Sequence, residues 1–297
     1  MILPNVVIAG APKCGTTSIF EWLSDHPDVC VSSTKETGYF IAPRGGAPDE
    51  LGSRQERGLE AYGRFFAHCG KRPGVKVILE ATPDYFDQET AIAAVPSLPS
   101  APIIVFILRK PSMRIYSAFQ FSRNNLSTLP KGMTFKEFVG LSPVSDGAPA
   151  TTVLRLTLDQ THYARHISRW IASAGRDRVC LFLFEDLLRD QAGFMRRLSA
   201  RIGIAPAFWD DYDFRRMNAS YRVRSQNLQR LVRRLTAAAP SLVRSDRLKR
   251  LYGLMNKQKT AGISAEDAVI MAGLDERFQP FNDELAQVGG IDLSCWK

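Results

Sequence analysis

The chain has 297 residues, of which 45% are hydrophobic, and this length supports one large α/β domain or two small ones with an ample core. The longest apolar run, Ile103–Leu108, falls far short of the roughly 18 residues of a membrane span, so we expect no stable membrane insertion. The formal net charge of +9 suits a polyanionic partner such as a nucleotide, a nucleic acid or an anionic surface.

The first predicted elements form a phosphate-binding arrangement. The apolar run Val6–Ala9 predicts a buried strand, a loop follows it, and a helical pattern begins at Thr16. Backbone N–H groups of such a loop and a helix N-terminus together suit an anion. Gly10 and Gly15 have the Walker spacing, which normally places a lysine directly after the second glycine. Here Thr16 occupies that position and Lys13 lies inside the loop, which predicts a phosphate site without the usual grip on Mg-ATP.

Apolar runs alternate with helical patterns along the chain. This alternation predicts a doubly wound parallel sheet with ligands at the carboxyl ends of its strands. The predicted strands are Val6–Ala9, Val29–Val31, Val75–Leu79, Ile103–Leu108 and Val179–Phe184. The predicted helices are Thr16–Ser24, Pro111–Ser122, Asp159–Ala174 and Leu187–Ile202. No convincing linker interrupts them, so we expect a P-loop-like parallel β-sheet flanked by helices in a single α/β domain over residues 1–297.

A second phosphate site is predicted after the strand Ile103–Leu108. Arg109 stands at the carboxyl end of this strand, Pro111 suits the first turn of the next helix, and Ser117 lies two turns into it. An arginine fork binds phosphate with better geometry than a lysine point charge. The alternative interpretation is a solvated arginine at the start of a helix.

The basic residues concentrate between Arg215 and Arg250, where eleven Lys and Arg accompany one acid, Asp246. Such a stretch is compatible with nucleic acid or another polyanion. However, apolar residues from 228 to 235 repeat at helical spacing, which leaves the arginines on a solvated face. No aromatic residues are interleaved for base stacking from 226 to 250, so we expect no nucleic-acid partner.

Histidines and cysteines carry weaker predictions. His162 and His166 are four residues apart on a predicted helix, but no third ligand accompanies them, so we interpret them as core residues and expect no metal site. Five cysteines, an odd number without a C-x-x-C pair, argue against a disulfide framework. The N-terminus shows no secretory signal pattern. We therefore expect reduced, mostly buried thiols and a cytoplasmic protein.

Taken together, the motifs resemble the sulfotransferases that use 3′-phosphoadenosine 5′-phosphosulfate (PAPS) as sulfuryl donor. The two phosphate motifs are Pro-Lys-x-Gly-Thr-Thr-Ser at 12–18 and Leu-Arg-x-Pro-x-x-Arg-x-x-Ser at 108–117. Further matches are Lys35-Glu36-Thr37 with Tyr39-Phe40, Glu80-Ala-Thr-Pro-Asp-Tyr85, Phe184-Glu-Asp-Leu187 and Leu-Ser-Cys-Trp296. Their order resembles that in the Golgi heparan sulfate sulfotransferases and their bacterial homologues, over nearly the whole chain.

The resemblance implies roles for the matching residues. Lys13 assists the leaving phosphate, and Glu36 is the general base. The backbone from Lys13 to Ser18 binds the 5′-phosphosulfate, and Arg109 with Ser117 binds the 3′-phosphate. A basic turn over Tyr221–Arg224 closes over the nucleotide. The implied donor-binding residues are Lys13, Cys14, Gly15, Thr16, Thr17, Ser18, Arg109, Ser117, Tyr221, Arg222 and Arg224.

Other positions qualify the resemblance. Glu185 and Asp186 end a predicted strand, where a catalytic carboxylate would be well placed, but the resemblance makes them structural groups that hold a neighbouring loop. Ala81 departs from the pattern, because several heparan enzymes carry a lysine there. The segments Tyr39–Gly58 and Asn124–Ala150 are too long for simple connections and should border the acceptor cleft. Neither has the dense basic track that a highly sulfated polymer requires.

The sequence thus predicts in-line transfer of a sulfuryl group from PAPS to a hydroxyl of a carbohydrate, glycolipid or small natural product, with no metal ion in the scheme. One alternative is a P-loop nucleotide kinase. The other is a nucleic-acid-binding or nucleotide-binding protein that uses the stretch Arg215–Arg250.

Overall fold

The computed structural model describes residues 1–42, 58–141, 148–214, 221–223, 257–259 and 262–297. The chain forms two compact units. The first comprises Met1–Lys110, His162–Met217 and Phe278–Lys297, and the second comprises Pro111–Thr161 and Asn218–Arg277. The expectation of one domain over residues 1–297 stays a prediction.

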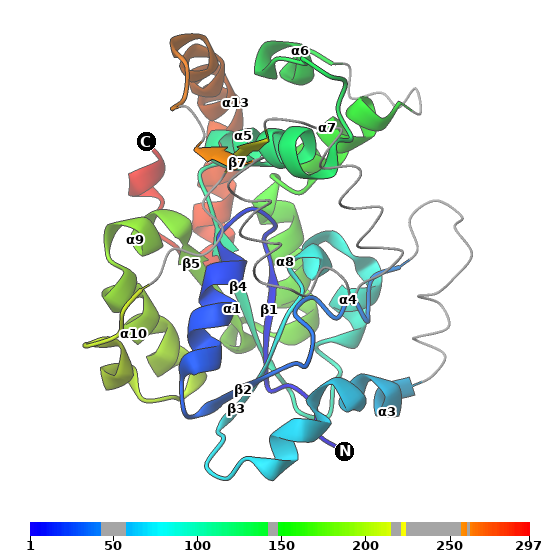
Figure 1. The fold of residues 1–297 in the computed structure, drawn as a ribbon, viewed down its shortest axis with the longest axis vertical. Coiled ribbons are helices and arrows are strands. Elements are labelled where there is room, and N and C mark those ends of the chain that lie inside the picture. Colours follow the sequence, from blue (N-terminus) through cyan, green and yellow to red (C-terminus); the bar gives the residue numbers. More distant parts are fainter. Residues whose placement is uncertain (43–57, 142–147, 215–220, 224–256, 260–261) are drawn as a thin grey trace. The chain divides into compact units, whose positions relative to one another are not determined.

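The first unit is built on a five-stranded parallel sheet flanked by helices, which confirms the predicted α/β class (Figure 1). The strand order is β2-β3-β1-β4-β5. The strands are β1 (Val6–Gly10), β2 (Val29–Val31), β3 (Val77–Ala81), β4 (Ile103–Leu108) and β5 (Val179–Leu183). Every residue of β1 is buried, which explains the continuous apolar run, because a central parallel strand is covered on both faces.

The helical elements of the first unit follow most of the predicted pattern. They are α1 (Thr16–Asp25), α3 (Gly58–Gly63), the 3₁₀ segments η1 (Arg64–Lys71), η2 (Pro83–Asp87), η4 (Arg176–Arg178), η5 (Pro206–Trp209) and η6 (Ser294–Trp296), and the α-helices α4 (Glu89–Ala94), α8 (Tyr163–Ala174), α9 (Phe184–Arg189) and α10 (Gln191–Ile202). Helix α13 (Ala265–Gly289) begins in the second unit and ends in the first. Across the described ranges, no helix combines the length and apolar character that a membrane crossing requires.

Two predicted helix boundaries are wrong for local reasons. The predicted helix Leu187–Ile202 is divided between α9 and α10, because Asp190 is extended and its carboxylate accepts the N–H of Gly193 at 2.8 Å. This N-cap starts a new helix. The predicted helix Asp159–Ala174 begins only at Tyr163, because the preceding helix already ends at Asp159.

The second unit contains α5 (Pro111–Phe121), the π-helical turn η3 (Ser122–Leu126), α6 (Phe135–Val139), α7 (Pro149–Asp159) and the antiparallel strands β6 (Tyr221–Val223) and β7 (Lys257–Lys259). Arg114 on α5 is buried, and its guanidinium donates to Thr157 O at 2.9 Å and to Gln160 Oε1 at 2.7 Å. These bonds hold α5 against the end of α7.

The segment Asn124–Ala150, interpreted from the sequence as a long connection, contains the helix α6 where the structure describes it. Thr134 and Glu137 form a reciprocal capping box that starts this short helix, and Phe135 and Phe138 are buried. The sequence signal was present, since a threonine followed three residues later by glutamate marks a helix start. Residues 43–57 and 142–147, in the two proposed acceptor segments, lie outside the described residues.

The expectation of five reduced thiols is also wrong, because Cys30 and Cys69 form a disulfide. It joins β2 to η1, across a sequence separation of 39 residues. Cys14, Cys180 and Cys295 remain as thiols. Disulfides are typical of oxidising compartments. Reduced thiols were one reason to expect a cytoplasmic protein, and the disulfide removes that reason. The cytoplasmic location stays a prediction.

We predict that the denatured, unreduced protein has three titratable thiols and that reduction raises the number to five. Cys69→Ser should lower the free energy of unfolding by roughly 3–4 kcal/mol, because the disulfide restricts a long loop of the unfolded chain. Denaturant unfolding measures this loss, and Cys295→Ser serves as control because that thiol is exposed. Five thiols before reduction would contradict the disulfide.

Candidate active site

The loop between β1 and α1 has the geometry expected of an anion cradle. Its first N–H group, on Ala11, donates to Ile107 O at 2.9 Å, which ties the loop to β4. Lys13 and Gly15 have left-handed φ angles of 72° and 81°. Helix α1 begins directly afterwards; no side chain within the described residues caps it, and its first turn has no acidic residue. The positive end of α1 is therefore left for an external anion.

Close approach of two phenylalanines explains both glycines of the loop. A Cβ on Gly10 would lie 2.6 Å from Phe86 Cδ2. A Cβ on Gly15 would lie 2.5 Å from Phe184 Cε2, and the left-handed backbone there disfavours a side chain independently. The glycine spacing noted in the sequence is thus required by packing on both sides of the loop.

Arg109 follows β4 and lies against this loop. Its Nη1 donates to Lys13 O at 3.4 Å, and its guanidinium carbon is 4.7 Å from the centre of the Phe184 ring. Burial lowers the pKa of Arg109 from its ordinary value, while the nearby Cys14 and Glu185 act in the opposite direction. The Nε atom of Arg109 is buried and has no hydrogen-bond partner among the described residues. A buried donor without a partner is costly, and an incoming anion would satisfy it.

Two side chains fix the backbone of this arginine. Tyr163 Oη donates to Arg109 O at 2.9 Å and lies 3.9 Å from Cys14 Sγ in the loop. Glu185 accepts the N–H of Lys110 at 3.0 Å. The structure therefore brings the loop residues and Arg109 together in the first unit.

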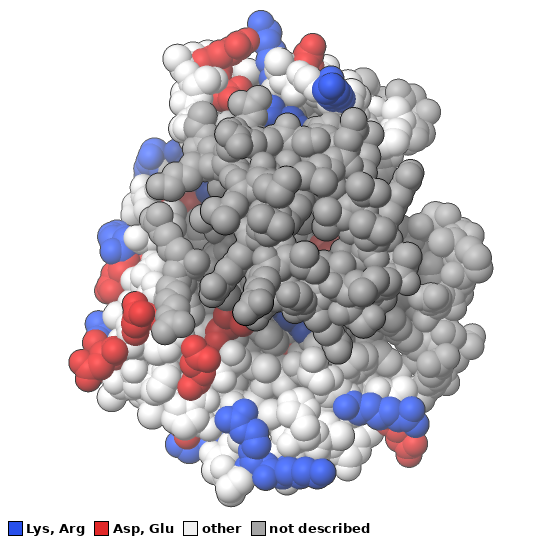
Figure 2. Space-filling view, viewed as in Figure 1, with Lys and Arg blue, Asp and Glu red and all other residues white. Residues whose placement is uncertain are grey.

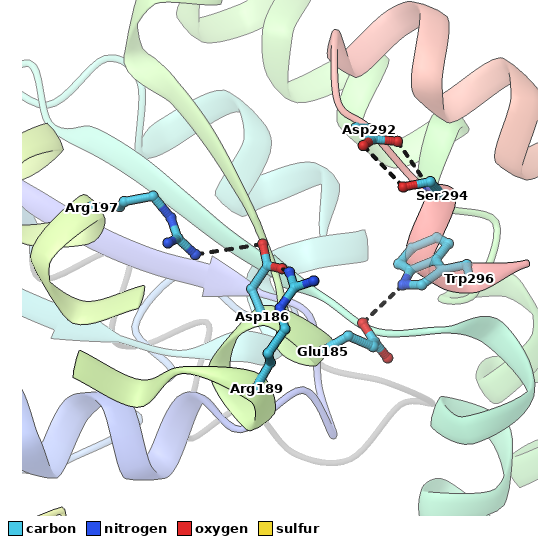
Figure 3. A network of polar contacts seen from close by, with 7 residues as sticks. All are labelled: Glu185, Asp186, Arg189, Arg197, Asp292, Ser294 and Trp296. Atoms are coloured by element: carbon cyan, nitrogen blue, oxygen red, sulfur yellow. Dashed lines mark hydrogen bonds and ion pairs between the residues drawn. The ribbon is translucent and has the colours of Figure 1, made fainter. Parts of the chain in front are cut away.

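Figure 3 shows the other contacts of the Glu185–Asp186 pair. Glu185 Oε2 accepts the indole N–H of Trp296 at 2.8 Å. Asp186 forms ion pairs with Arg189 and, at 3.6 Å, with Arg197 Nη2. These contacts fit the structural role that the resemblance implied, since both carboxylates connect neighbouring segments of the first unit.

Glu36 lies on the loop after β2, and its N–H donates to Ala81 O at 3.0 Å, at the end of β3. Its side chain is 52% exposed and forms an ion pair with Lys35. An exposed pair of this kind is by itself an ordinary surface feature. The backbone conformation of Glu36 is unusual for a residue other than glycine, because its φ angle is left-handed, at 60°. A non-glycine residue in this region is held there by its surroundings, often at a functional site.

A second carboxylate near this loop, that of Glu80, is buried, whereas the Glu36 side chain is exposed. Glu80 on β3 is fully buried and accepts hydrogen bonds from Thr37 at 2.6 Å, Thr82 at 2.7 Å and Tyr62 at 2.5 Å. Burial raises the pKa of Glu80, and the hydroxyl hydrogen bonds act in the opposite direction.

Several predicted donor residues belong to the second unit. Ser117 lies in α5, so its pairing with Arg109 stays a prediction. Tyr221 and Arg222 are in β6, where a turn was predicted; that prediction is wrong because their backbone pairs with Gln258 and Lys259 of β7. Arg224 lies outside the described residues, as does most of the basic stretch 215–250.

The two histidines of the predicted helix pack against aromatic rings, but only His166 is a core residue, because His162 is half-buried. His162 lies against the rings of Phe278 and Phe281, at 5.2 and 4.4 Å between ring centres. His166 is buried, 5.0 Å from the Phe86 ring. A different group, Cys30, His68 and Cys69, has metal-ligand spacing in the described part of the chain, but its two sulfurs are joined in the disulfide.

Sequence reasoning missed Tyr163 and Phe184 as site residues and gave Glu80 no role. Tyr163 falls inside the predicted helix Asp159–Ala174, and Phe184 is the last residue of a predicted strand. Glu80 was part of a motif that carried the resemblance, which was the available signal. The contacts of all three depend on the fold, so spacing along the chain cannot reveal them.

Comparisons with known proteins agree with this geometry. The model of the sulfotransferase family matches residues 4–211, a range that includes the loop, Glu36 and Arg109. Among curated relatives, the mouse bifunctional heparan sulfate N-deacetylase/N-sulfotransferase 4 is 26% identical over 213 residues, which cover 69% of this chain and 23% of that protein. Human bifunctional heparan sulfate N-deacetylase/N-sulfotransferase 1 is 28% identical over 197 residues, covering 63% and 20%. The chain thus spans about a quarter or less of the length of these relatives.

A solved structure supports the same fold. The sulfotransferase from Alicyclobacillus acidocaldarius superposes with a TM-score of 0.65 at 21% identity, over 100% of this chain and 99% of that one. At this identity the match concerns architecture only. Because the family model covers more than half of the chain and includes its anion loop, the chain belongs to the PAPS-dependent sulfotransferase family.

Proposed function

We propose that this protein transfers the sulfuryl group of PAPS to a hydroxyl of a carbohydrate, glycolipid or small natural product. Two observations carry the proposal: no described side chain caps the start of α1, and Arg109, which contacts the loop before α1, has a buried Nε without a partner within the described ranges. Two anion-binding elements side by side suit a donor with two phosphate positions. Family membership favours this proposal over the kinase alternative, while the nucleic-acid alternative depends on the stretch 215–250, beyond the matched residues 4–211.

The residues of the first unit fit such a donor. The amides from Lys13 to Ser18 bind the 5′-phosphosulfate at the start of α1, and Gly10 and Gly15 leave room for the loop to pack closely. Arg109 is the residue of this unit that we propose for the 3′-phosphate. The proposal also keeps the roles predicted from the sequence for Ser117, Tyr221, Arg222 and Arg224, which belong to the second unit. Thr16 replaces the lysine that kinases use, and no metal ion enters this scheme.

PAPS supplies a sulfuryl group already activated by its phosphate bond. Glu36 accepts the proton of the acceptor hydroxyl while that oxygen forms a bond to sulfur. Lys13 and the loop amides stabilise the negative charge that develops as the bond between sulfur and the bridging oxygen breaks. The remaining product is 3′,5′-adenosine bisphosphate (PAP). The hydrogen bond from the N–H of Glu36 to Ala81 O keeps Glu36 beside the end of β3.

The acceptor we propose is small and neutral or weakly charged. In the sequence, neither proposed acceptor segment, Tyr39–Gly58 or Asn124–Ala150, has a dense basic track, and the coloured side chains that Figure 2 shows include both acidic and basic ones. A highly sulfated chain requires such a track for charge neutralisation. The named activity of the heparan sulfate relatives is N-sulfation, so an amine is the second acceptor class to test.

We predict that PAP binds much more tightly than AMP and that Arg109→Ala removes most of this difference. A hydrogen bond to a charged group contributes roughly 1.5–3 kcal/mol, so the loss should be about 10- to 150-fold in Kd. Calorimetry with both nucleotides measures it. Arg196→Ala is the control, because Arg196 is half exposed and pairs with Asp210. A preference for ATP, or a magnesium requirement for binding, would overturn the donor assignment.

We predict that Glu36→Gln lowers kcat by about two to four orders of magnitude, the usual contribution of a general base, and leaves the Kd of PAP unchanged. Lys13→Ala should lower kcat and also weaken donor binding. Steady-state kinetics together with calorimetry separate the two, and Glu60→Gln on the exposed side of α3 is the control. An intact kcat in Glu36→Gln would move the base to Asp84 or to a histidine.

The acceptor class is tested with matched substrates. We expect a PAPS-dependent mass increase on a methyl glycoside, and on its 2-amino counterpart we expect the sulfate on an oxygen and not on the amine, as located by fragmentation in the mass spectrometer, because the proposed nucleophile is a hydroxyl. A desulfated heparan chain is included as the polymeric substrate. Tight, salt-sensitive binding of that chain with productive sulfation would contradict the small-acceptor proposal.

A further inference from the structure

The loop that carries Glu36 is fastened to the sheet by one buried cluster of hydroxyl groups, which we call the Glu80 cluster. It consists of Glu80 and the hydroxyls of Thr37, Tyr62, Thr82 and Tyr85. All five residues are buried, and they come from β3, α3, η2 and the loops beside them. The cluster lies wholly in the first unit.

Counting protons fixes the direction of its hydrogen bonds. Each hydroxyl has a single proton, and Thr37 donates its proton to Glu80 Oε1 at 2.6 Å. The proton of Tyr85 is then directed toward Thr37 Oγ1, at 3.2 Å, and toward Glu80, with which Tyr85 also forms a hydrogen bond. Thr82 and Tyr62 donate to Oε1 and Oε2. An ionised Glu80 is the acceptor that satisfies all these donors at once, because a carboxylate accepts only.

The same hydroxyl oxygens then accept from the backbone of the Glu36 loop. Thr82 Oγ1 accepts the N–H of Gly38, Thr37 Oγ1 accepts that of Tyr39, and Tyr85 Oη accepts that of Phe40, each at 3.3 Å. The three residues after Thr37 are thus all bound to the cluster. Gly38, with a left-handed φ of 61°, lies within this tethered segment, and Glu36, with a left-handed φ of 60°, directly precedes Thr37.

We infer that Glu80 is a positioning residue for the transfer reaction: through Thr37 and the tethered backbone it holds Glu36 in the conformation in which it accepts the acceptor proton. Glu80 itself is fully buried and touches no substrate, so it acts only through Glu36. The inference rests on the proposed role of Glu36. It assigns a function to a buried charge that would otherwise be costly to retain.

The test uses a matched pair at Thr37. Thr37→Val removes the hydroxyl, and Thr37→Ser retains it. We expect Thr37→Val to lower kcat by about 10- to 100-fold, because small displacements of a reacting group have effects of this size. The Kd of PAP and the KM of the acceptor should not change, and Thr37→Ser should retain kcat. Glu80→Gln should lower kcat likewise if it folds, which the melting temperature reports.

A double-mutant cycle with Glu36→Gln distinguishes positioning from general stability. If Thr37 acts through Glu36, Thr37→Val lowers kcat no further in the Glu36→Gln background. Ser199→Ala is the structural control: this buried hydroxyl accepts the indole N–H of Trp209 at 2.6 Å, so its loss should lower the melting temperature without changing kcat.

The outcomes distinguish the positioning role of the Glu80 cluster from the role of Glu36 as general base. Equal losses of kcat from Thr37→Val in both backgrounds, or no loss in the wild-type background, would overturn the positioning role while leaving Glu36 as the base. An unchanged kcat in Glu36→Gln alone would overturn the base assignment, and the positioning role with it.

Discussion

All five strands of the sheet run in the same direction, and this single constraint brings the candidate site together. Because the strands are parallel, the loop after β1, the Glu36 loop after β2, the end of β3 and Arg109 after β4 all emerge at one edge. Residues nearly a hundred positions apart, such as Lys13 and Arg109, contact each other there.

The edge is held by buried polar groups rather than by apolar packing alone. Arg109 and Glu80 carry opposite charges, and each is stabilised by specific partners. Around Arg109 these are the Phe184 ring and the carbonyl of Lys13. Around Glu80 they are hydroxyl groups. A buried charged group is stable only where its hydrogen-bond partners are correctly placed. It therefore restricts the conformation of the adjoining backbone more than apolar contacts do. Both charges adjoin a segment to which we assign part of the transfer reaction.

Continuous apolar runs made the sheet predictable. β2 and β4 have the predicted bounds, because buried parallel strands need apolar residues on both faces. The division at Asp190 was missed because an aspartate inside a helical pattern is ambiguous until its side chain is seen to cap Gly193. The Cys30–Cys69 pair was missed because an odd cysteine count says nothing about which sulfurs meet in space. Tyr163 and Phe184 support Arg109 through tertiary contacts alone.

The sheet also has two outer strands, and one of them is protected in a specific way. β2 is only three residues long, η1 packs beside it, and the Cys30–Cys69 bond fastens that segment in place. An outer strand exposes N–H and C=O groups that another chain can bind, and short or covered edges suppress such pairing. The disulfide should therefore reduce self-association through this edge. In a concentrated, reducing solution the edge would become available to a second molecule.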